Sequence, residues 1–233
     1  MVDNILCTYR VWGSENMRLV EIFNSLQGEG PFMGRRSTFV RLHGCNVGCL
    51  WCDTQYARRG WLETTPESVA DACDRFRCKN VVITGGEPSI QPAELRELTQ
   101  SLSRRGYHIT IETNGTHPEV ITLCDATAVV VSPKDMHTAE RWLSIFHNGQ
   151  KTYFKFVVDE HDVGEKLRWI KEHVDRAQQG RVYLMPMTYD ATAGQEAIIS
   201  DMIEDGQVII KMMIEYEVDC AISPRLQYLF RVR

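Results

Sequence analysis

The sequence predicts an α/β fold, a curved and incomplete (β/α)6-type partial TIM barrel. From residue 80 onward, short apolar β-branched runs alternate with amphipathic segments, a pattern typical of right-handed βαβ units and a parallel sheet. The alternation yields about six strands, too few for a closed eight-stranded barrel. Polar and glycine-rich residues follow the ends of these runs, and that edge carries the active site in barrels and open sheets alike.

The composition predicts one compact domain over residues 1–233, because a chain that is 43 % hydrophobic and 24 % charged can bury a sizeable core. Residues 1–17 are polar and irregular and are expected to form an N-terminal extension. Residues 206–233 are expected to supply a C-terminal helix and strand that complete the site.

Charge and cysteine usage point to a cytoplasmic protein. The net charge of −5 gives no basic field for direct nucleic-acid binding. The start of the chain lacks the pattern of a signal peptide, and no apolar run approaches the roughly 20 residues of a membrane span. The eight cysteines show no disulfide framework, which favours a reducing compartment.

The first elements lead into a cysteine-rich loop. Residues 19–26 read as a strand that ends in a turn of two glycines and Pro31, and residues 37–42 alternate as a second strand. After the loop, a helix is expected over 66–76, with Thr65 as its N-cap and proline at its first position.

Strand and helix then alternate. Residues 81–84 form a β-branched run that glycines stop, and residues 91–105 carry a helical face of leucines. The remaining strands are expected at residues 107–112, 128–131, 153–158, 182–185 and 218–222. The remaining helices are expected at residues 138–146, 163–174, 194–204 and 206–216.

The loop contains three cysteines, Cys45, Cys49 and Cys52, in a Cys-x3-Cys-x2-Cys spacing. Thiolates are the usual ligands of iron–sulfur clusters, and three of them leave one iron of a four-iron cluster open to an exogenous molecule. Two other interpretations stay open. The cysteines are part of a zinc site with His43 as a fourth ligand, or they are buried thiols that pack as small hydrophobes.

A second motif, Gly85-Gly86-Glu87-Pro88, follows a predicted strand. Glycines allow backbone groups to approach a ligand closely. Together with the cysteine loop, it resembles the signature of radical S-adenosylmethionine (SAM) enzymes. That resemblance implies a [4Fe-4S] cluster on Cys45, Cys49 and Cys52, with SAM chelating the open iron and being cleaved to a radical.

Within that superfamily, the chain from about residue 20 to about residue 190 resembles the 7-carboxy-7-deazaguanine synthase family. The motifs that carry the resemblance are Leu26-Gln27-Gly28-Glu29-Gly30, Phe39-Val40-Arg41-Leu42-His43-Gly44-Cys45-Asn46, Trp51-Cys52-Asp53-Thr54, Thr84-Gly85-Gly86-Glu87-Pro88, Glu112-Thr113-Asn114-Gly115 and Ser132-Pro133-Lys134.

The resemblance implies a lyase that converts 6-carboxy-5,6,7,8-tetrahydropterin to 7-carboxy-7-deazaguanine with loss of ammonia, using SAM and magnesium. The implied SAM-site residues are Trp51, Cys52, Asp53, Gly86, Ser132, Pro133, Lys134, Met185, Pro186 and Met187. The implied substrate contacts are Leu26, Gln27, Gly28, Arg41, Thr84, Glu112 and Gln227. Thr54 matches the residue whose hydroxyl ligates magnesium.

The residue types suit these roles. The guanidinium of Arg41 offers a fork of donors for a carboxylate, and Gln27 and Glu112 can pair with the amide and amino edges of a pterin. A lone threonine is a poor magnesium site, so the substrate carboxylate is expected to supply much of the affinity. Other roles stay open: Thr54 as an N-cap, Arg41 as a surface charge and Glu112 as an ion-pair partner.

Two positions depart from the family pattern. The family often carries Gln-Pro where Met185-Pro186 stands, on the adenine side of the SAM site. The tail Ser223-Pro224-Arg225-Leu226-Gln227 resembles a family tail that commonly has His where Gln227 stands.

The resemblance also implies a homodimer and a protein reductant such as flavodoxin. The nearest alternative is another radical SAM enzyme, such as an activase that abstracts hydrogen from a glycine of a partner protein. The sequence leaves open whether the product feeds tRNA queuosine synthesis or a modified-DNA pathway.

Overall fold

The computed structural model describes residues 16–149, 151–187 and 193–232, so most of the predicted extension at residues 1–17 lies outside the described residues. The chain divides into two compact units. Unit 1 holds the chain up to Ser25 together with residues 35–49 and 54–129, and unit 2 holds residues 26–34, 50–53 and 130–233. The single domain over 1–233 stays a prediction.

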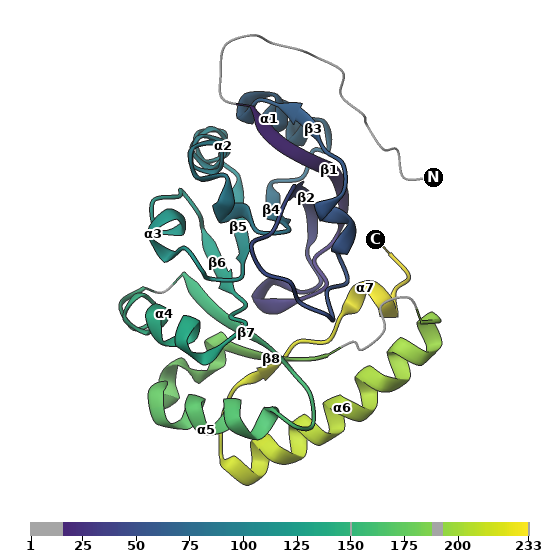
Figure 1. Ribbon diagram of the computed structural model, residues 1–233, viewed down its shortest axis with the longest axis vertical. Helices are drawn as coiled ribbons and strands as arrows, with labels where there is room; N and C mark the ends of the chain where they lie inside the picture. Colours follow the sequence, from purple (N-terminus) through teal and green to yellow (C-terminus); the bar gives the residue numbers. More distant parts are fainter. Residues whose placement is uncertain (1–15, 150, 188–192, 233) are drawn as a thin grey trace. The chain divides into compact units, whose positions relative to one another are not determined.

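Unit 1 is built on strands that are hydrogen-bonded in the order β3-β1-β2-β4-β5 (Figure 1). β1 and β3 pair antiparallel, whereas β2, β4 and β5 are parallel, which the alternation of elements from residue 80 predicts for β4 and β5. The bounds are Met17–Leu26 for β1, Arg36–Leu42 for β2, Leu62–Thr64 for β3, Asn80–Gly85 for β4 and His108–Thr113 for β5.

The helices of unit 1 begin where the sequence places start signals. Thr65 caps α1, because its side-chain oxygen accepts a hydrogen bond from the backbone N–H of Ser68 at 3.2 Å. The predicted leucine face of α2 is buried, with Leu95, Leu98 and Leu102 fully enclosed. The bounds are Pro66–Arg75 for α1, Pro92–Arg104 for α2 and Pro118–Ile121 for α3, with 3₁₀ turns η2 at Gln55–Arg58 and η3 at Pro88–Ile90.

Unit 2 continues the alternation of strands and helices. β6, at Ala128–Val131, lies at the division of the two units, and β7, β8 and β9 form a parallel ladder. The bounds are Thr152–Val158 for β7, Val182–Pro186 for β8, Ala221–Ile222 for β9, Met136–Asn148 for α4, Val163–His173 for α5, Gln195–Tyr216 for α6 and Leu226–Leu229 for α7, with 3₁₀ turns η1 at Gly30–Phe32 and η4 at Arg176–Arg181.

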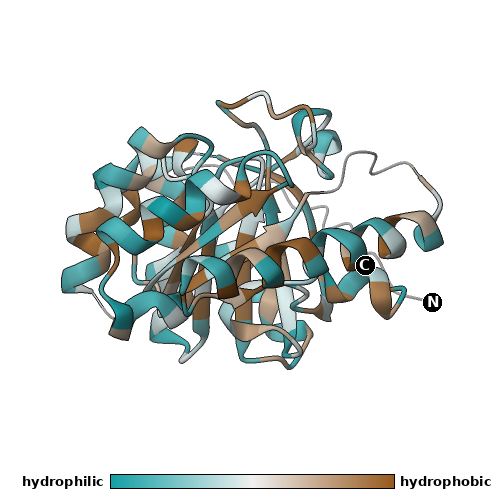
Figure 2. Cartoon of the chain, turned by 90° about the horizontal axis from the view of Figure 1, so that it is seen from below, coloured by the Kyte–Doolittle hydropathy of each residue, from teal (hydrophilic) through white to brown (hydrophobic). Residues whose placement is uncertain are grey.

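Aromatic side chains fill the core of unit 2. The rings of Phe146 and Phe154 are stacked with centroids 4.8 Å apart, and Trp169 meets Phe154 edge-on at 5.8 Å. Figure 2 shows the corresponding pattern along the chain, with hydrophobic residues on the strands and alternating hydrophilic and hydrophobic residues on the helices. These aromatic contacts pack α4 and α5 against β7.

The structure corrects the predicted C-terminal elements. The helices expected at 194–204 and 206–216 are one helix, α6, of 22 residues that passes through Gly206. The strand expected at 218–222 is only Ala221–Ile222, and the short helix α7 follows it. Within the described residues, no helix combines the length and the apolar character that crossing a membrane requires.

Candidate active site

Three predicted substrate residues lie side by side at the carboxyl ends of the strands of unit 1. Arg41 on β2 is the direct register partner of Thr84 on β4. Ile83 pairs with Ile111 on β5, so the next residues along the two parallel strands, Thr84 and Glu112, lie opposite each other. Directly paired residues of neighbouring strands share a face of the sheet. The parallel ladder therefore aligns the three side chains along one edge, which the sequence predicts for Thr84 and Glu112.

Arg41 is fixed before any ligand arrives. Its Nε donates to Glu21 Oε1 at 2.9 Å, and both side chains are largely buried, at 13 % and 12 % exposed. The guanidinium carbon lies 5.7 Å from the ring centre of Phe23 and 5.5 Å from that of Tyr56. The interpretation of Arg41 as a surface charge is therefore wrong. The residues that the structure describes give its two terminal nitrogens no hydrogen-bond partner.

The glycine motif after β4 requires glycine for a steric reason. Gly85 has φ +148°, and a Cβ there would lie 2.2 Å from the carbonyl oxygen of Leu42. A Cβ on Gly86 would lie 1.9 Å from the carbonyl oxygen of Gly44 and 2.9 Å from the Cβ of Cys45. The motif therefore packs directly against the start of the cysteine loop.

The cysteines of the loop form no disulfide, lie on irregular backbone and are each partly exposed. Cys45 and Cys49 belong to unit 1 and Cys52 to unit 2. Among the described residues, no three His, Cys, Asp or Glu side chains lie close enough together to hold a metal ion. Metal binding couples to the local ordering of its ligands. Three accessible, unoxidised sulfurs fit the donor set of an iron–sulfur cluster, and their role as ligands stays a prediction.

Backbone hydrogen bonds anchor the beginning of the loop. The N–H of Gly44 donates to the carbonyl of Ala57 at 3.0 Å, and the N–H of Glu87 donates to the carbonyl of Gly44 at 2.7 Å.

His43, the alternative zinc ligand, is buried and its ring lies 4.3 Å from that of Trp61. Burial, and then the charge of Arg18, lowers the pKa of His43.

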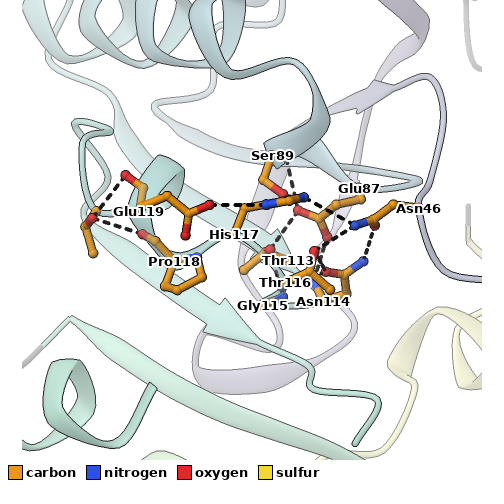
Figure 3. A network of polar contacts seen from close by, with 11 residues as sticks. Asn46, Glu87, Ser89, Thr113, Asn114, Gly115, Thr116, His117, Pro118 and Glu119 are labelled. Carbon is orange, nitrogen blue, oxygen red and sulfur yellow. Dashed lines mark hydrogen bonds and ion pairs between the residues drawn. The ribbon is translucent and has the colours of Figure 1, made fainter. Parts of the chain in front are cut away.

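Glu87 joins the ends of β4 and β5 through a buried network (Figure 3). Its carboxylate accepts from the Ser89 N–H at 3.0 Å, the Thr113 hydroxyl at 2.7 Å and the Asn114 N–H at 2.6 Å. Asn114 in turn donates to Asn46 at 2.9 Å. A fully enclosed carboxylate with several donors holds the two strand ends in register. This network thus positions the edge that carries Glu112.

Thr54 precedes η2 at its N-cap position, but its side chain makes no capping hydrogen bond. The backbone carbonyl of Thr54 instead accepts from the N–H of Ala57 at 3.0 Å. The alternative role of Thr54 as a side-chain cap is therefore wrong. Its role toward magnesium stays a prediction.

Unit 2 contributes the remaining predicted SAM residues. Ser132 and Pro133, directly after β6, are buried, and Lys134 Nζ lies 3.1 Å from Ser132 Oγ. Met185 and Met187 at the end of β8 are 4 % and 8 % exposed. Pro186 is buried, Trp51 and Cys52 are partly exposed and Asp53 is exposed.

A charged cluster in unit 2 was missed by the sequence interpretation. Lys155 Nζ donates to Glu29 Oε2 at 2.8 Å, Gln227 Nε2 donates to Glu29 Oε1 at 2.9 Å, and Arg225 Nε lies 3.7 Å from that same oxygen. Burial alone raises the pKa of Glu29, but the charges of Lys155 and Arg225 outweigh burial and lower the pKa to about 2. The carboxylate is therefore ionised throughout the physiological range.

One of these residues carried a usable signal. Lys155 interrupts an otherwise apolar strand, and a lysine inside a buried run needs a partner. Glu29 stands inside a quoted motif without an assigned role, and Arg225 has no local pattern that distinguishes it from a surface arginine.

Comparisons with known proteins give the same assignment. The Radical SAM superfamily matches residues 39–134. The 7-carboxy-7-deazaguanine synthase of Hyperthermus butylicus is 33 % identical over 93 % of this chain and 93 % of its own. The enzyme of the same name from Pyrobaculum aerophilum is 37 % identical over 78 % of this chain and 84 % of its own.

A solved structure of QueE from Escherichia coli is 25 % identical, with a TM-score of 0.64 over 90 % of this chain and 93 % of that one. The similarity confirms the predicted fold class, an α/β partial barrel of the radical SAM type. The near full-length relatives share one name. This chain belongs to the 7-carboxy-7-deazaguanine synthase family.

Proposed function

We propose that this protein is a radical SAM lyase that converts 6-carboxy-5,6,7,8-tetrahydropterin to 7-carboxy-7-deazaguanine with loss of ammonia. The observation that carries the proposal is the alignment of Arg41, Thr84 and Glu112 on one strand edge, in a chain with near full-length relatives named for that product. Cys45, Cys49 and Cys52 hold the [4Fe-4S] cluster in this proposal. When bound, that cluster supplies the electron that cleaves SAM.

In this proposal, the residues of the strand edge bind and orient the pterin. The two terminal nitrogens of Arg41 donate hydrogen bonds to the substrate carboxylate, while Glu21 fixes the orientation of the guanidinium. Glu112 accepts from the amide and amino edge of the ring. Orientation of the reacting carbon is a large part of the acceleration that a protein gives to a reaction of this kind.

The proposed function is tested with anaerobically reconstituted protein, SAM, a reductant and the tetrahydropterin. We expect SAM-dependent formation of 7-carboxy-7-deazaguanine, identified by mass and absorbance, and release of ammonia. Protein that carries the cluster and cleaves SAM but forms no product from this pterin contradicts the proposal. The activase alternative predicts instead a SAM-dependent glycyl radical on a partner protein.

Replacement of Arg41 by alanine is expected to weaken pterin binding, because a lost charge-assisted hydrogen bond is worth about 1.5–3 kcal/mol, or roughly 10- to 150-fold in affinity. Reductant-driven SAM cleavage in the absence of pterin should persist. The measurement compares the apparent pterin constant and the affinity for SAM. Arg59→Ala removes an exposed arginine and serves as the control. An equal loss of SAM affinity in Arg41→Ala contradicts a substrate role.

Replacement of Thr54 by valine is expected to remove most of the magnesium dependence of turnover, because the shape is kept and one ligand oxygen is lost. A single neutral oxygen binds magnesium weakly, so the ion should bind wild-type protein only when the pterin is present. Titration calorimetry of magnesium into SAM-loaded protein, with and without pterin, measures this directly. If plots of turnover rate against magnesium concentration are identical for wild type and Thr54→Val, Thr54 has no role in binding magnesium.

A further inference from the structure

The backbone before the first cysteine of the loop is fastened to unit 1 by a buried glutamine. Gln91, directly after η3, is 3 % exposed and donates from Nε2 to the carbonyl of His43 at 3.1 Å. Its Oε1 accepts from the N–H of Arg18 at 2.7 Å, which fixes the orientation of the amide. The chain therefore approaches Cys45 from a fixed point, and Asn46 is placed to fix the other side.

Asn46, Asn114 and Thr116 form a closed ring of side-chain hydrogen bonds (Figure 3). Asn46 Nδ2 donates to Thr116 Oγ1 at 2.9 Å, the Thr116 hydroxyl donates to Asn114 Oδ1 at 2.8 Å, and Asn114 Nδ2 donates to Asn46 Oδ1 at 2.9 Å. Each side chain thus donates once and accepts once within the ring. Hydrogen bonds joined in such a sequence polarise and strengthen one another.

The backbone of the turn after β5 sets the direction of this ring. The N–H of Thr116 donates to Asn114 Oδ1 at 3.0 Å, so this oxygen faces the turn and the amide nitrogen of Asn114 faces Asn46. Asn114 is 7 % exposed, whereas Asn46 is exposed. The buried asparagine therefore belongs to the strand end, and the exposed asparagine reaches it from the cysteine loop.

Asn114 also belongs to the edge that carries the expected substrate contacts. Its N–H donates to the buried carboxylate of Glu87 at 2.6 Å, and it lies two residues after Glu112. One hydrogen bond, between Asn114 and Asn46, therefore joins this edge to the residue that directly follows Cys45. The asparagine pair thus ties the position of Cys45 to that of Glu112.

We propose that Asn46 and Asn114 are positioning residues, which hold the Cys45 end of the cysteine loop at a fixed separation from Glu112. The inference rests on the proposed function, in which Cys45 is one ligand of the cluster and Glu112 orients the pterin. Reaction between two separately bound partners is sensitive to misplacement, and an error of about 1 Å can cost roughly 100-fold in rate. The asparagine pair therefore couples the consumption of SAM to the conversion of the pterin.

Aspartate substitutions test the pair, because aspartate has the shape of asparagine but its carboxylate only accepts hydrogen bonds. In Asn46→Asp, the Asn114 nitrogen still has an acceptor at position 46. In Asn114→Asp, the amide of Asn46 can turn so that its nitrogen donates to position 114. Each single variant therefore keeps the contact and controls for the added charge. Only the double variant sets two acceptors against each other, so the double-mutant cycle isolates the pair.

The first measurement is hydrogen–deuterium exchange in the full chain before reconstitution of a cluster, followed in peptides that cover residues 44–48 and 113–116. We expect wild type and both single variants to exchange alike. The double variant should exchange about fivefold faster in both peptides, as expected for the net loss of one hydrogen bond. Unchanged exchange in the double variant, or the same acceleration in a single variant, overturns the inference.

The second measurement is the amount of SAM consumed for each molecule of product that reconstituted protein forms. Wild type and both single variants should share one ratio. The double variant should raise it severalfold at an unchanged apparent constant for the pterin, a separation that a general loss of folded protein does not produce. An unchanged ratio contradicts the coupling. If wild type forms no product from this pterin, the proposed function falls, while the exchange data still decide whether the pair holds the loop.

Discussion

Cys49→Ala protein is expected to contain no iron–sulfur cluster and to cleave no SAM, because two thiolates cannot hold a four-iron cluster with one open iron. The same total loss is expected for Cys45→Ala and Cys52→Ala. Iron and sulfide analysis with visible absorbance, measured after anaerobic reconstitution, checks this. SAM cleavage is followed separately by chromatography.

The chain supplies its own controls for the cysteine experiment. Cys73, Cys78, Cys124 and Cys220 are buried, form no disulfide and lie outside the cysteine motif, and their replacement by alanine should leave iron content and SAM cleavage unchanged. Burial raises the pKa of both Cys73 and Cys220 to about 12, so neither supplies a thiolate near neutral pH. Full cluster content in Cys49→Ala protein would contradict the assignment of these three cysteines as the cluster ligands.

Replacement of Glu29 by glutamine is expected to lower the free energy of unfolding by about 3–5 kcal/mol, because it leaves Lys155 and Arg225 buried without a counter-charge. Thermal unfolding of wild type and variant, compared at the same cluster content, measures the loss. Glu217→Gln removes an exposed partner of Lys171 and should change stability by less than about 1 kcal/mol. A Glu29→Gln loss as small as that of the control contradicts the role of Glu29 as the essential counter-charge.

The pH dependence of stability tests independently whether Glu29 is the counter-charge of Lys155 and Arg225. Burial opposes ionisation, but Lys155 and Arg225 lower the pKa of Glu29 from 4.5 to about 2. A carboxylate with a lowered folded pKa stabilises the protein fully above its unfolded pKa, and the benefit is lost as pH falls from about 4.5 to about 2. At 1.36 kcal/mol per pKa unit, the loss is roughly 3 kcal/mol. Glu29→Gln should flatten this part of the stability curve.

Local patterns in the sequence were sufficient to predict the strand edge of unit 1. Strands with parallel neighbours end together, so the residues after 84 and 112 were expected at one edge, and the register of β2, β4 and β5 places them there. Thr65 was recognisable as a cap because its interaction spans only three residues. Signals of this kind depend on neighbours in the chain, which a sequence displays directly.

Local sequence patterns could not predict the elements whose form depends on tertiary packing. Gly206 suggested a break because glycine costs about 1 kcal/mol in a helix, but α6 runs through it, with Ile198 and Ile209 buried on either side. β3 has only three residues and exists because it pairs with β1. Lys155 and Arg225 both follow Glu29 by more than 100 residues in the chain, and no local rule connects them to it.

The contact between Gly28 and Gln227 also has a consequence for the history of the family. Because the side-chain amide of Gln227 occupies the space where a side chain at position 28 would begin, a larger residue at 28 requires the Gln227 side chain to move away from its place beside Gly28. The two positions, nearly 200 residues apart, are expected to covary in relatives. Glycine at 28 therefore leaves room for a long polar side chain at 227 to lie against the backbone of residue 28.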